Sequence, residues 1–171
     1  VALRGYEDRR CLGVNEVPVC LDVMHAADID CILLAGRYTL LDRSAVAELL
    51  PLCEKKGTSL VVGGVFNSGI LATGPVPGAH FDYLPATPDV VAKVGAMEEI
   101  ARTHGLPLAQ PALQFPLRHP CVASVLIGTA KATSLIRNMQ LVEPRLPDSL
   151  YAEFEGLTLV APPLGDEAVR V

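Results

Sequence analysis

The sequence predicts an α/β protein built on a parallel β-sheet. Short apolar runs alternate along the chain with segments whose apolar residues recur at helical spacing, which is the pattern of successive βα units. Half of the 171 residues are hydrophobic and only 19% are charged, so the chain is too apolar to be disordered and has to bury a core. Because it contains no Trp and few aromatic residues, we expect Leu, Val, Ile and Ala to fill that core.

Four apolar runs predict the strands of the sheet. They cover residues 11–14, 29–35, 59–62 and 123–127. The second run is apolar almost throughout, which predicts a strand buried on both faces of the sheet. The third and fourth runs are closed by glycines, Gly63 and Gly128.

Segments with helical periodicity separate these runs. Pro18, early in the first segment, and Gly57, directly after the second, are typical of helix ends. The predicted helices are residues 18–27, 42–56, 88–104, 109–117, 132–141 and 148–155. Residues 72–87 hold several Gly and Pro residues without periodicity, so we predict a long loop after the third strand, of the kind that is usually functional or mobile.

Charge and cysteine usage exclude several classes of protein. The chain has 14 Lys and Arg against 19 Asp and Glu, a net charge of −5, which argues against a nucleic-acid partner. No apolar run approaches the ~20 residues of a membrane span. The five cysteines form no CxxC pair, so we predict reduced, buried cysteines and a cytoplasmic location. Because no His pair has HExxH spacing either, we predict no metal site. The first residue is Val, from which we expect a processed or partial chain.

A parallel sheet of this kind belongs either to an open, doubly wound fold or to a (β/α)8 barrel. In both architectures ligands bind at the carboxyl ends of the strands. Polar residues and glycines gather at those positions in this chain, namely at residues 15–16, 36–38, 63–68 and 128–131. The sequence therefore predicts a ligand site where these four segments meet.

Two of the strand-end segments have two interpretations each. Residues 63–68 offer glycines that let a ligand approach the backbone, with polar side chains beside Phe66, but an ordinary turn explains the same residues. Residues 128–134 lead from a glycine turn into a helix N-terminus, which favours phosphate. The alternative is that Thr133 or Ser134 caps this helix. Neither segment matches GxGxxG or the P-loop pattern.

Four segments resemble the second half of the aldo-keto reductases, in particular the branch of L-fucose, D-threo-aldose and pyridoxal dehydrogenases. The segments are GVNEV at 13–17, ILLAGRYTLLD at 32–42, VGGVFNSGIL at 62–71 and LIG at 126–128, with Asn138 ten positions after Gly128. They come in the family's order and spacing. The resemblance extends from about residue 12 to residue 155.

The resemblance implies the (β/α)8 TIM barrel fold, with only its C-terminal half present and the four predicted strands as strands five to eight. A complete barrel takes about 250 residues, so we expect residues 1–171 to form a single partial domain with an atypical start at residues 1–11. In this family the catalytic tetrad of Asp, Tyr, Lys and His lies on the first four strands. No catalytic residue is therefore assigned in this chain.

The resemblance also implies a nicotinamide cofactor. Asn15 matches the residue that holds the carboxamide, and residues 66–68 match positions near the nicotinamide and the pyrophosphate. Residues 128–130 match the loop around the adenosine ribose, with Ser134 and Asn138 toward the adenine. The expected cofactor-binding residues are Asn15, Tyr38, Phe66, Asn67, Ser68, Gly128, Thr129, Ala130, Lys131, Ser134 and Asn138.

We expect NAD rather than NADP, because Gly128 stands where many NADP-dependent relatives carry Lys, with Lys131 or Arg137 as the alternative source of charge. The implied reaction is hydride transfer between the cofactor and the carbonyl or lactol carbon of a small substrate such as an aldose. The alternative is a non-catalytic half-barrel that binds a dinucleotide or acts as a scaffold. Open sheet edges and an apolar inner face favour association with a second copy or with a front half.

Overall fold

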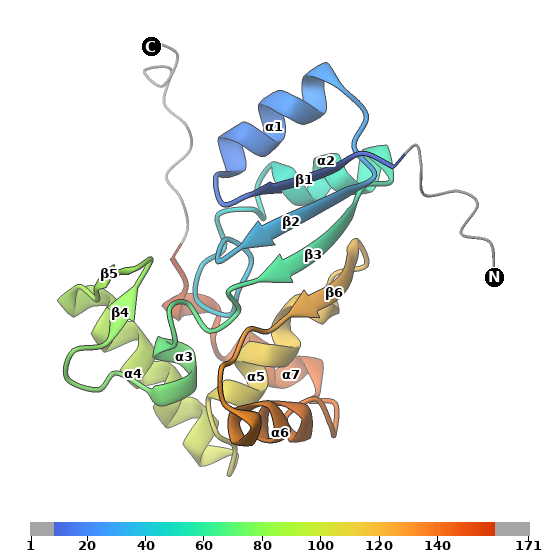
Figure 1. The fold of residues 1–171 in the computed structure, drawn as a ribbon. Helices are drawn as coiled ribbons and strands as arrows, with labels where there is room; N and C mark the ends of the chain where they lie inside the picture. Colours follow the sequence, from blue (N-terminus) through green and yellow to red (C-terminus); the bar gives the residue numbers. More distant parts are fainter. Residues whose placement is uncertain (1–8, 160–171) are drawn as a thin grey trace.

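The computed structural model describes residues 9–159, so most of the predicted atypical start lies outside the described residues. Its main sheet contains four parallel strands in the order β1-β2-β3-β6 (Figure 1). These are β1 Cys11–Val14, β2 Cys31–Ala35, β3 Ser59–Gly63 and β6 Val122–Leu126. Neighbouring strands follow the order of the chain, whereas a doubly wound sheet reverses its order at a switch point. The described strands therefore have the topology of one side of a (β/α)8 barrel.

The two faces of this sheet differ in burial. Ile32 and Leu34 of β2 are fully buried, whereas Leu33, which lies between them, is 39% exposed and Leu126 of β6 is 54% exposed. Successive side chains of a strand point to opposite faces, so one face is covered and the other is open in the described part of the chain. The prediction that the second strand is buried on both faces is wrong for these residues, because no described element covers the face of Leu33.

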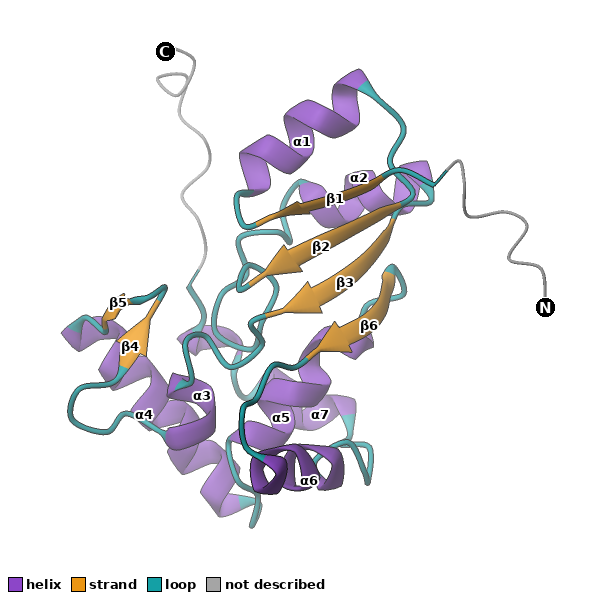
Figure 2. Cartoon of the chain, viewed as in Figure 1, coloured by secondary structure: helices purple, strands orange, loops and turns teal. Residues whose placement is uncertain are grey.

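Helices α1 and α2 cover the buried face beside β1 and β2 (Figure 2). Helix α1 (Val17–Ala26) has Pro18 in its first turn and buries Cys20 and Met24. Helix α2 (Leu49–Lys56) ends on Gly57, whose φ of 71° closes the last turn in the left-handed conformation.

The remaining predicted helices are present in the predicted order, with ends that differ by a few residues, whereas α3, β4, β5 and η2 were not predicted. Helix α4 starts where predicted because Thr87 Oγ1 accepts a hydrogen bond from the N–H of Val90. None of the described helices is long and apolar enough to cross a bilayer. These elements are α3 Ile70–Thr73, β4 His80–Phe81, β5 Leu84–Pro85, α4 Pro88–Thr103, α5 Ala109–Gln114, the 3₁₀ helix η1 Phe115–Arg118, α6 Ala132–Gln140, α7 Asp148–Ala152 and the 3₁₀ helix η2 Glu155–Leu157.

The predicted helix 42–56 begins seven residues too early, since α2 starts at Leu49. The backbone around Asp42 pairs with Leu159 instead: the N–H of Leu159 donates to Leu41 O, and the N–H of Arg43 donates to Leu159 O. The Asp42 carboxylate also accepts from the N–H of Ser44 at 2.9 Å. This segment is therefore held in an extended turn by a partner more than a hundred positions away in the chain.

The predicted loop 72–87 is not without regular structure, because it contains the β4–β5 hairpin. His80 pairs with Pro85 and Phe81 with Leu84 in antiparallel register. The two residues between the strands, Asp82 and Tyr83, have φ values of 50° and 65°, as a two-residue hairpin turn of type I′ requires. The sequence signal is weak because Tyr is uncommon at such a position.

Candidate functional site

The carboxyl ends of the four strands surround a cavity of about 270 Å³. The strand arrows in Figure 1 point toward the side on which the β4–β5 hairpin lies. The walls come from the segments after β1, β2, β3 and β6 and from that hairpin. Five of the residues predicted from the sequence line it: Asn15, Phe66, Asn67, Ser68 and Gly128.

Gly64 shapes the wall between the ends of β2 and β3. Its φ is 62°, and a Cβ atom at this position would lie 3.1 Å from the backbone nitrogen of Gly36. The N–H of Gly36 in turn donates to Gly63 O at 3.0 Å. Only glycine allows both the left-handed conformation and this close approach.

Asn67 is one of the structural supports of the cavity. Its side chain is buried, with the residue only 5% exposed. Its Oδ1 accepts from Thr39 Oγ1 at 2.7 Å, and its Nδ2 donates to Gly36 O at 3.2 Å. Both ends of the amide are therefore used to join the segments that follow β2 and β3.

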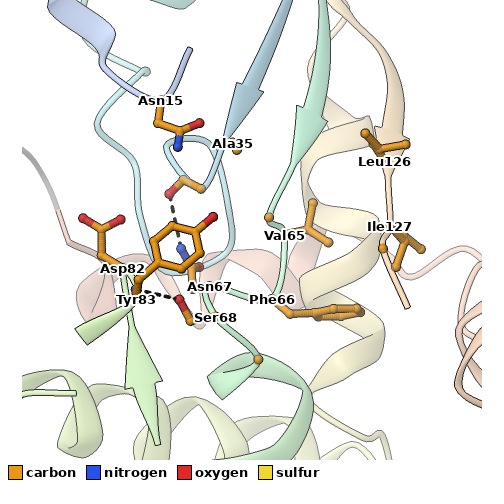
Figure 3. A pocket seen from close by; sticks show the side chains of 14 residues that line it. Asn15, Ala35, Val65, Phe66, Asn67, Ser68, Asp82, Tyr83, Leu126 and Ile127 are labelled. Carbon is orange, nitrogen blue, oxygen red and sulfur yellow. Dashed lines mark hydrogen bonds between the residues drawn. The ribbon is translucent and has the colours of Figure 1, made fainter. Parts of the chain in front are cut away.

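Asn15 differs from Asn67 because its amide faces the cavity (Figure 3). Its backbone carbonyl accepts from Arg37 Nε at 3.0 Å and its backbone N–H donates to Glu16 Oε2. Its side-chain amide has no hydrogen-bond partner among the described residues. This amide is thus available to a ligand as both donor and acceptor.

Two aromatic rings and a group of aliphatic side chains also line the cavity. Figure 3 shows the ring of Tyr83 on the hairpin side and the ring of Phe66 near Leu126 and Ile127. Ser68 lies beside Tyr83, and its Oγ accepts from the N–H of Tyr83 at 3.0 Å. The site therefore combines flat apolar surfaces with a small number of polar groups, which is typical of cofactor and small-molecule sites.

Arg37 connects three walls of the cavity. Its Nη2 lies 3.1 and 2.9 Å from the two carboxylate oxygens of Asp82, its Nη1 lies 3.3 Å from Asp42 Oδ2, and its Nε binds the carbonyl of Asn15. Partial burial opposes the charge, but hydrogen bonds and charge from Asp82, together with Asp42, outweigh it and raise the pKa of Arg37.

Sequence reasoning did not find the roles of Arg37, Asp82 and Tyr83. The strand-end rule predicts residues 36–38 as part of the site, but nothing in the sequence links Arg37 to a turn some 45 residues later. Asp82 and Tyr83 both have positive φ, which defines the turn. A φ value is a property of the folded backbone and cannot be read from the sequence.

The structure does not bring the other predicted residues to this cavity. Tyr38 is 5% exposed, and its ring packs 5.1 Å from that of Phe115. Asn138 is buried in α6. The loop from β6 to α6 carries Thr129, Ala130 and Lys131, and Ser134 lies in the first turn of α6.

The alternative that Thr133 or Ser134 caps α6 is wrong. The cap position is Lys131, and no side chain caps this helix. The Oγ1 of Thr129 instead accepts from the N–H of Lys131 at 3.2 Å, which stabilises the loop before the helix. The free N–H groups of the first turn therefore point out of the helix without a side-chain partner.

Few ionisable side chains line the described cavity. Its described lining contains no Lys, Arg or His, and its ionisable side chains are Asp82 and Tyr83. Asp82 is paired with Arg37. In the described part of the chain, no group of three or more His, Cys, Asp or Glu side chains has the arrangement of a metal site.

This strand topology is that of a known class of proteins. The sequence pattern of the aldo/keto reductase family matches residues 10–158, so the chain belongs to that family. The predicted resemblance and the partial barrel are both confirmed.

Individual members of the family show how similar this chain is to known proteins. The chain is 41% identical over 150 residues to pyridoxal 4-dehydrogenase of Microbacterium luteolum, covering 88% of this chain and 44% of the relative. It is 36% identical over 138 residues to D-threo-aldose 1-dehydrogenase of a Pseudomonas species, covering 80% and 42%. The holo form of aldo-keto reductase AKR11C1 from Bacillus halodurans superposes with a TM-score of 0.70 at 25% identity, over 88% of this chain and 50% of the other. The chain thus spans about half the length of the relatives it matches.

Proposed function

We propose that the intact protein is a nicotinamide-dependent oxidoreductase and that this chain forms the cofactor side of its active site. The substrate class is a small carbonyl compound or the lactol form of an aldose. The observation that carries the proposal is the cavity at the strand ends, in which an unpaired amide faces flat apolar surfaces. The two relatives are a pyridoxal dehydrogenase and an aldose dehydrogenase, which supports the substrate class.

The residues present fit a nicotinamide dinucleotide. The amide of Asn15 matches a carboxamide in hydrogen-bonding capacity, and the rings of Phe66 and Tyr83 offer faces for a flat ring. Gly64 lets the turn after β3 lie close to Gly36, because a Cβ atom at Gly64 would meet the backbone of Gly36. The bound cofactor would accept a hydride from a lactol or supply one to a carbonyl carbon, while these residues orient its ring and exclude water.

We assign the adenosine end to the loop after β6. Gly128 lies at the rim of the cavity, and Thr129, Ala130 and Lys131 continue from it toward the first turn of α6 with Ser134. The free N–H groups of that turn would attract a phosphate. Asn138 is buried in α6, so it would not contact the adenine directly and would only help to position α6.

We favour NAD over NADP. In the loop assigned to the adenosine end, Gly128 stands where many NADP-dependent relatives carry Lys, so this position offers no charge to the additional phosphate of NADP. Following the family resemblance, we place the catalytic acid and base in the part of the barrel that this chain does not include.

A fluorescence titration of the intact protein tests the proposal. The chain has no Trp, so the emission of bound NADH is observed with little interference from these residues. We expect saturable binding, tighter for NADH than for NADPH. Absence of saturable binding of either cofactor contradicts the proposed function, and a clear preference for NADPH contradicts the assignment to NAD.

A further inference from the structure

Two cysteines lie side by side at the amino ends of the first two strands. Cys11 is the first residue of β1, Cys31 is the first residue of β2, and the parallel register pairs them directly. Side chains of paired residues on neighbouring strands point to the same face of a sheet, so both thiols lie on the face that carries Leu33. Figure 1 shows these ends of β1 and β2 opposite the arrowheads, and therefore away from the cavity.

Contacts directly before the two cysteines hold this register. The N–H of Arg10 donates to Asp30 Oδ2 at 2.9 Å, and the N–H of Asp30 donates to Arg10 O at 2.9 Å. The N–H of Cys31 also donates to Arg10 O, at 3.4 Å. The two thiols are thus neighbours because of contacts within the described sheet, whatever covers its open face.

The Cys31 thiol senses its neighbour. Burial raises its pKa, and the adjacent Cys11 thiol and the charge of Asp30 raise it further. Cys20 and Cys53 lie elsewhere, on helices α1 and α2 that cover the opposite face of the sheet. Cys11 and Cys31 therefore form a pair of thiols of their own on the open face.

The spacing of the strands suits a disulfide bond that is easily reduced. Neighbouring strands lie about 4.8 Å apart, within the range of about 4.4–6.8 Å between the Cα atoms of a disulfide. The two Cβ atoms point the same way and keep nearly the strand spacing, so they have to approach to about 3.8 Å for the bond to form. A disulfide strained in this way is readily reduced, which is typical of regulatory rather than structural disulfides.

We propose that Cys11 and Cys31 are a redox-active dithiol, a modification site at which a low-molecular-weight disulfide such as oxidised glutathione generates a reversible bond between β1 and β2. The thiolate of one cysteine attacks the oxidant, releases one glutathione and leaves a mixed disulfide on the protein. The second thiolate attacks the protein sulfur of that bond, forms the Cys11–Cys31 bond and releases the second glutathione. Two protein thiols are oxidised, one glutathione disulfide is reduced to two thiols, and the two protons pass to the released glutathione.

Peptide mass spectrometry of the native, reduced intact protein after incubation with oxidised glutathione tests the proposal. The remaining thiols are alkylated first. Trypsin leaves Cys11, Cys20 and Cys31 on one peptide, so the protein is cleaved after its acidic residues. We expect a linked pair of peptides that carry Cys11 and Cys31, lighter by two hydrogen atoms than their sum, and its loss on treatment with dithiothreitol. In the intact protein, whatever covers the open face is in place.

Three variants show whether the link is specific. Cys11→Ser and Cys31→Ser should each lose it, and the remaining cysteine of the pair should keep a bound glutathione, because no second thiol releases it. Cys121→Ser is the matched control: its Sγ contacts His119 Nδ1 at 3.0 Å instead, and this variant should form the link like the wild type. Unchanged melting of the reduced variants by circular dichroism shows that the fold is intact.

The contrary results are equally clear. If no linked peptides form in the native protein, or if glutathione stays on both cysteines without a link between them, the proposal is overturned. A link from Cys11 to Cys20 or Cys53 in place of Cys31 also overturns it, as does a link that persists in Cys31→Ser.

Discussion

Asn15 and Asn67 both line the cavity, but their side chains have different tasks. The Asn67 amide is fully engaged, with Thr39 on one end and Gly36 on the other. The Asn15 amide has no partner among the described residues and faces the cavity. One asparagine therefore builds the site and the other is available to what binds there.

This difference predicts opposite effects of the same substitution. Asn67→Ala leaves a buried hydroxyl and a carbonyl without their partner, and should lower the free energy of unfolding by about 1–3 kcal/mol. Asn15→Ala should leave that free energy unchanged and weaken NADH binding. Chemical denaturation and the fluorescence titration measure the two effects. If Asn15→Ala instead lowered the free energy of unfolding and left NADH binding normal, Asn15 would be a structural residue and the role assigned to it would be wrong.

The prediction of buried cysteines is confirmed for Cys20 and Cys53, which should be inert, and is wrong for Cys11, which is exposed. Burial raises the pKa of Cys20 to about 11 and that of Cys53 to about 12, so both thiols stay protonated near neutral pH and thiolate chemistry is suppressed. Because the pKa of each thiol is higher in the folded than in the unfolded protein, the protonated thiols stabilise the folded state, and this contribution is complete below the usual thiol pKa. It is lost as the pH rises through 11 to 12.

Labelling with an alkylating reagent at pH 8, followed by peptide mass spectrometry, tests this expectation. The exposed Cys11 should react in the native protein, whereas Cys20 and Cys53 should react only after denaturation. Labelling of Cys53 in the native protein at a rate like that of Cys11 would contradict the burial that raises its pKa.

At the scale of elements, the turn after β3 is the part of the site most sensitive to sequence. Gly64 and Gly57 both have left-handed φ, but a Cβ at Gly57 meets nothing within 4 Å, whereas one at Gly64 meets the backbone of Gly36. Replacing each glycine by alanine therefore separates two costs: Gly57→Ala measures the left-handed conformation alone, and Gly64→Ala adds the contact with Gly36.

We expect Gly57→Ala to destabilise the protein by about 1 kcal/mol, the usual cost of a left-handed alanine, without an effect on cofactor binding. Gly64→Ala should destabilise it more and also weaken NADH binding, because the displaced Gly36 lines the cavity. Thermal melts and NADH titrations of both variants measure this. Equal destabilisation with normal binding would show that the close approach is relaxed without cost.

The elements that could be predicted from the sequence are those set by local pattern. Strands β2 and β3 and helix α4 follow from apolar runs, helical spacing and a Thr-Pro start. The start of α2 could not be predicted, because the pairing of Leu159 with residues 41–43 depends on a partner far along the chain. The same holds for the site: Asn15 and Ser68 follow from the strand-end rule, whereas the Arg37–Asp82 contact depends on tertiary structure.

At the scale of the whole molecule, the open face of the sheet is the main feature. Leu33 and Leu126 are exposed on it, and β1 and β6 are unpaired edges of the described sheet. Such a surface favours association. We expect the other part of the barrel, or a second copy of this chain, to cover it.

The 171-residue chain by itself should therefore self-associate and be catalytically inactive. Size-exclusion chromatography with light scattering measures the first property, and NADH consumption with an aldehyde measures the second. Leu33→Glu, which places a charge on the open face, should reduce association. A monomeric chain that consumes NADH above a protein-free control would contradict both expectations.

We propose that the carboxyl ends of these strands hold a nicotinamide dinucleotide. Hydrogen–deuterium exchange of the intact protein with and without NAD tests it most directly. We predict slower exchange with NAD in residues 63–69 and 126–128, at the carboxyl ends of β3 and β6, and no change in residues 56–59 at the amino end of β3. Protection at the amino ends, or none at all, would contradict this account.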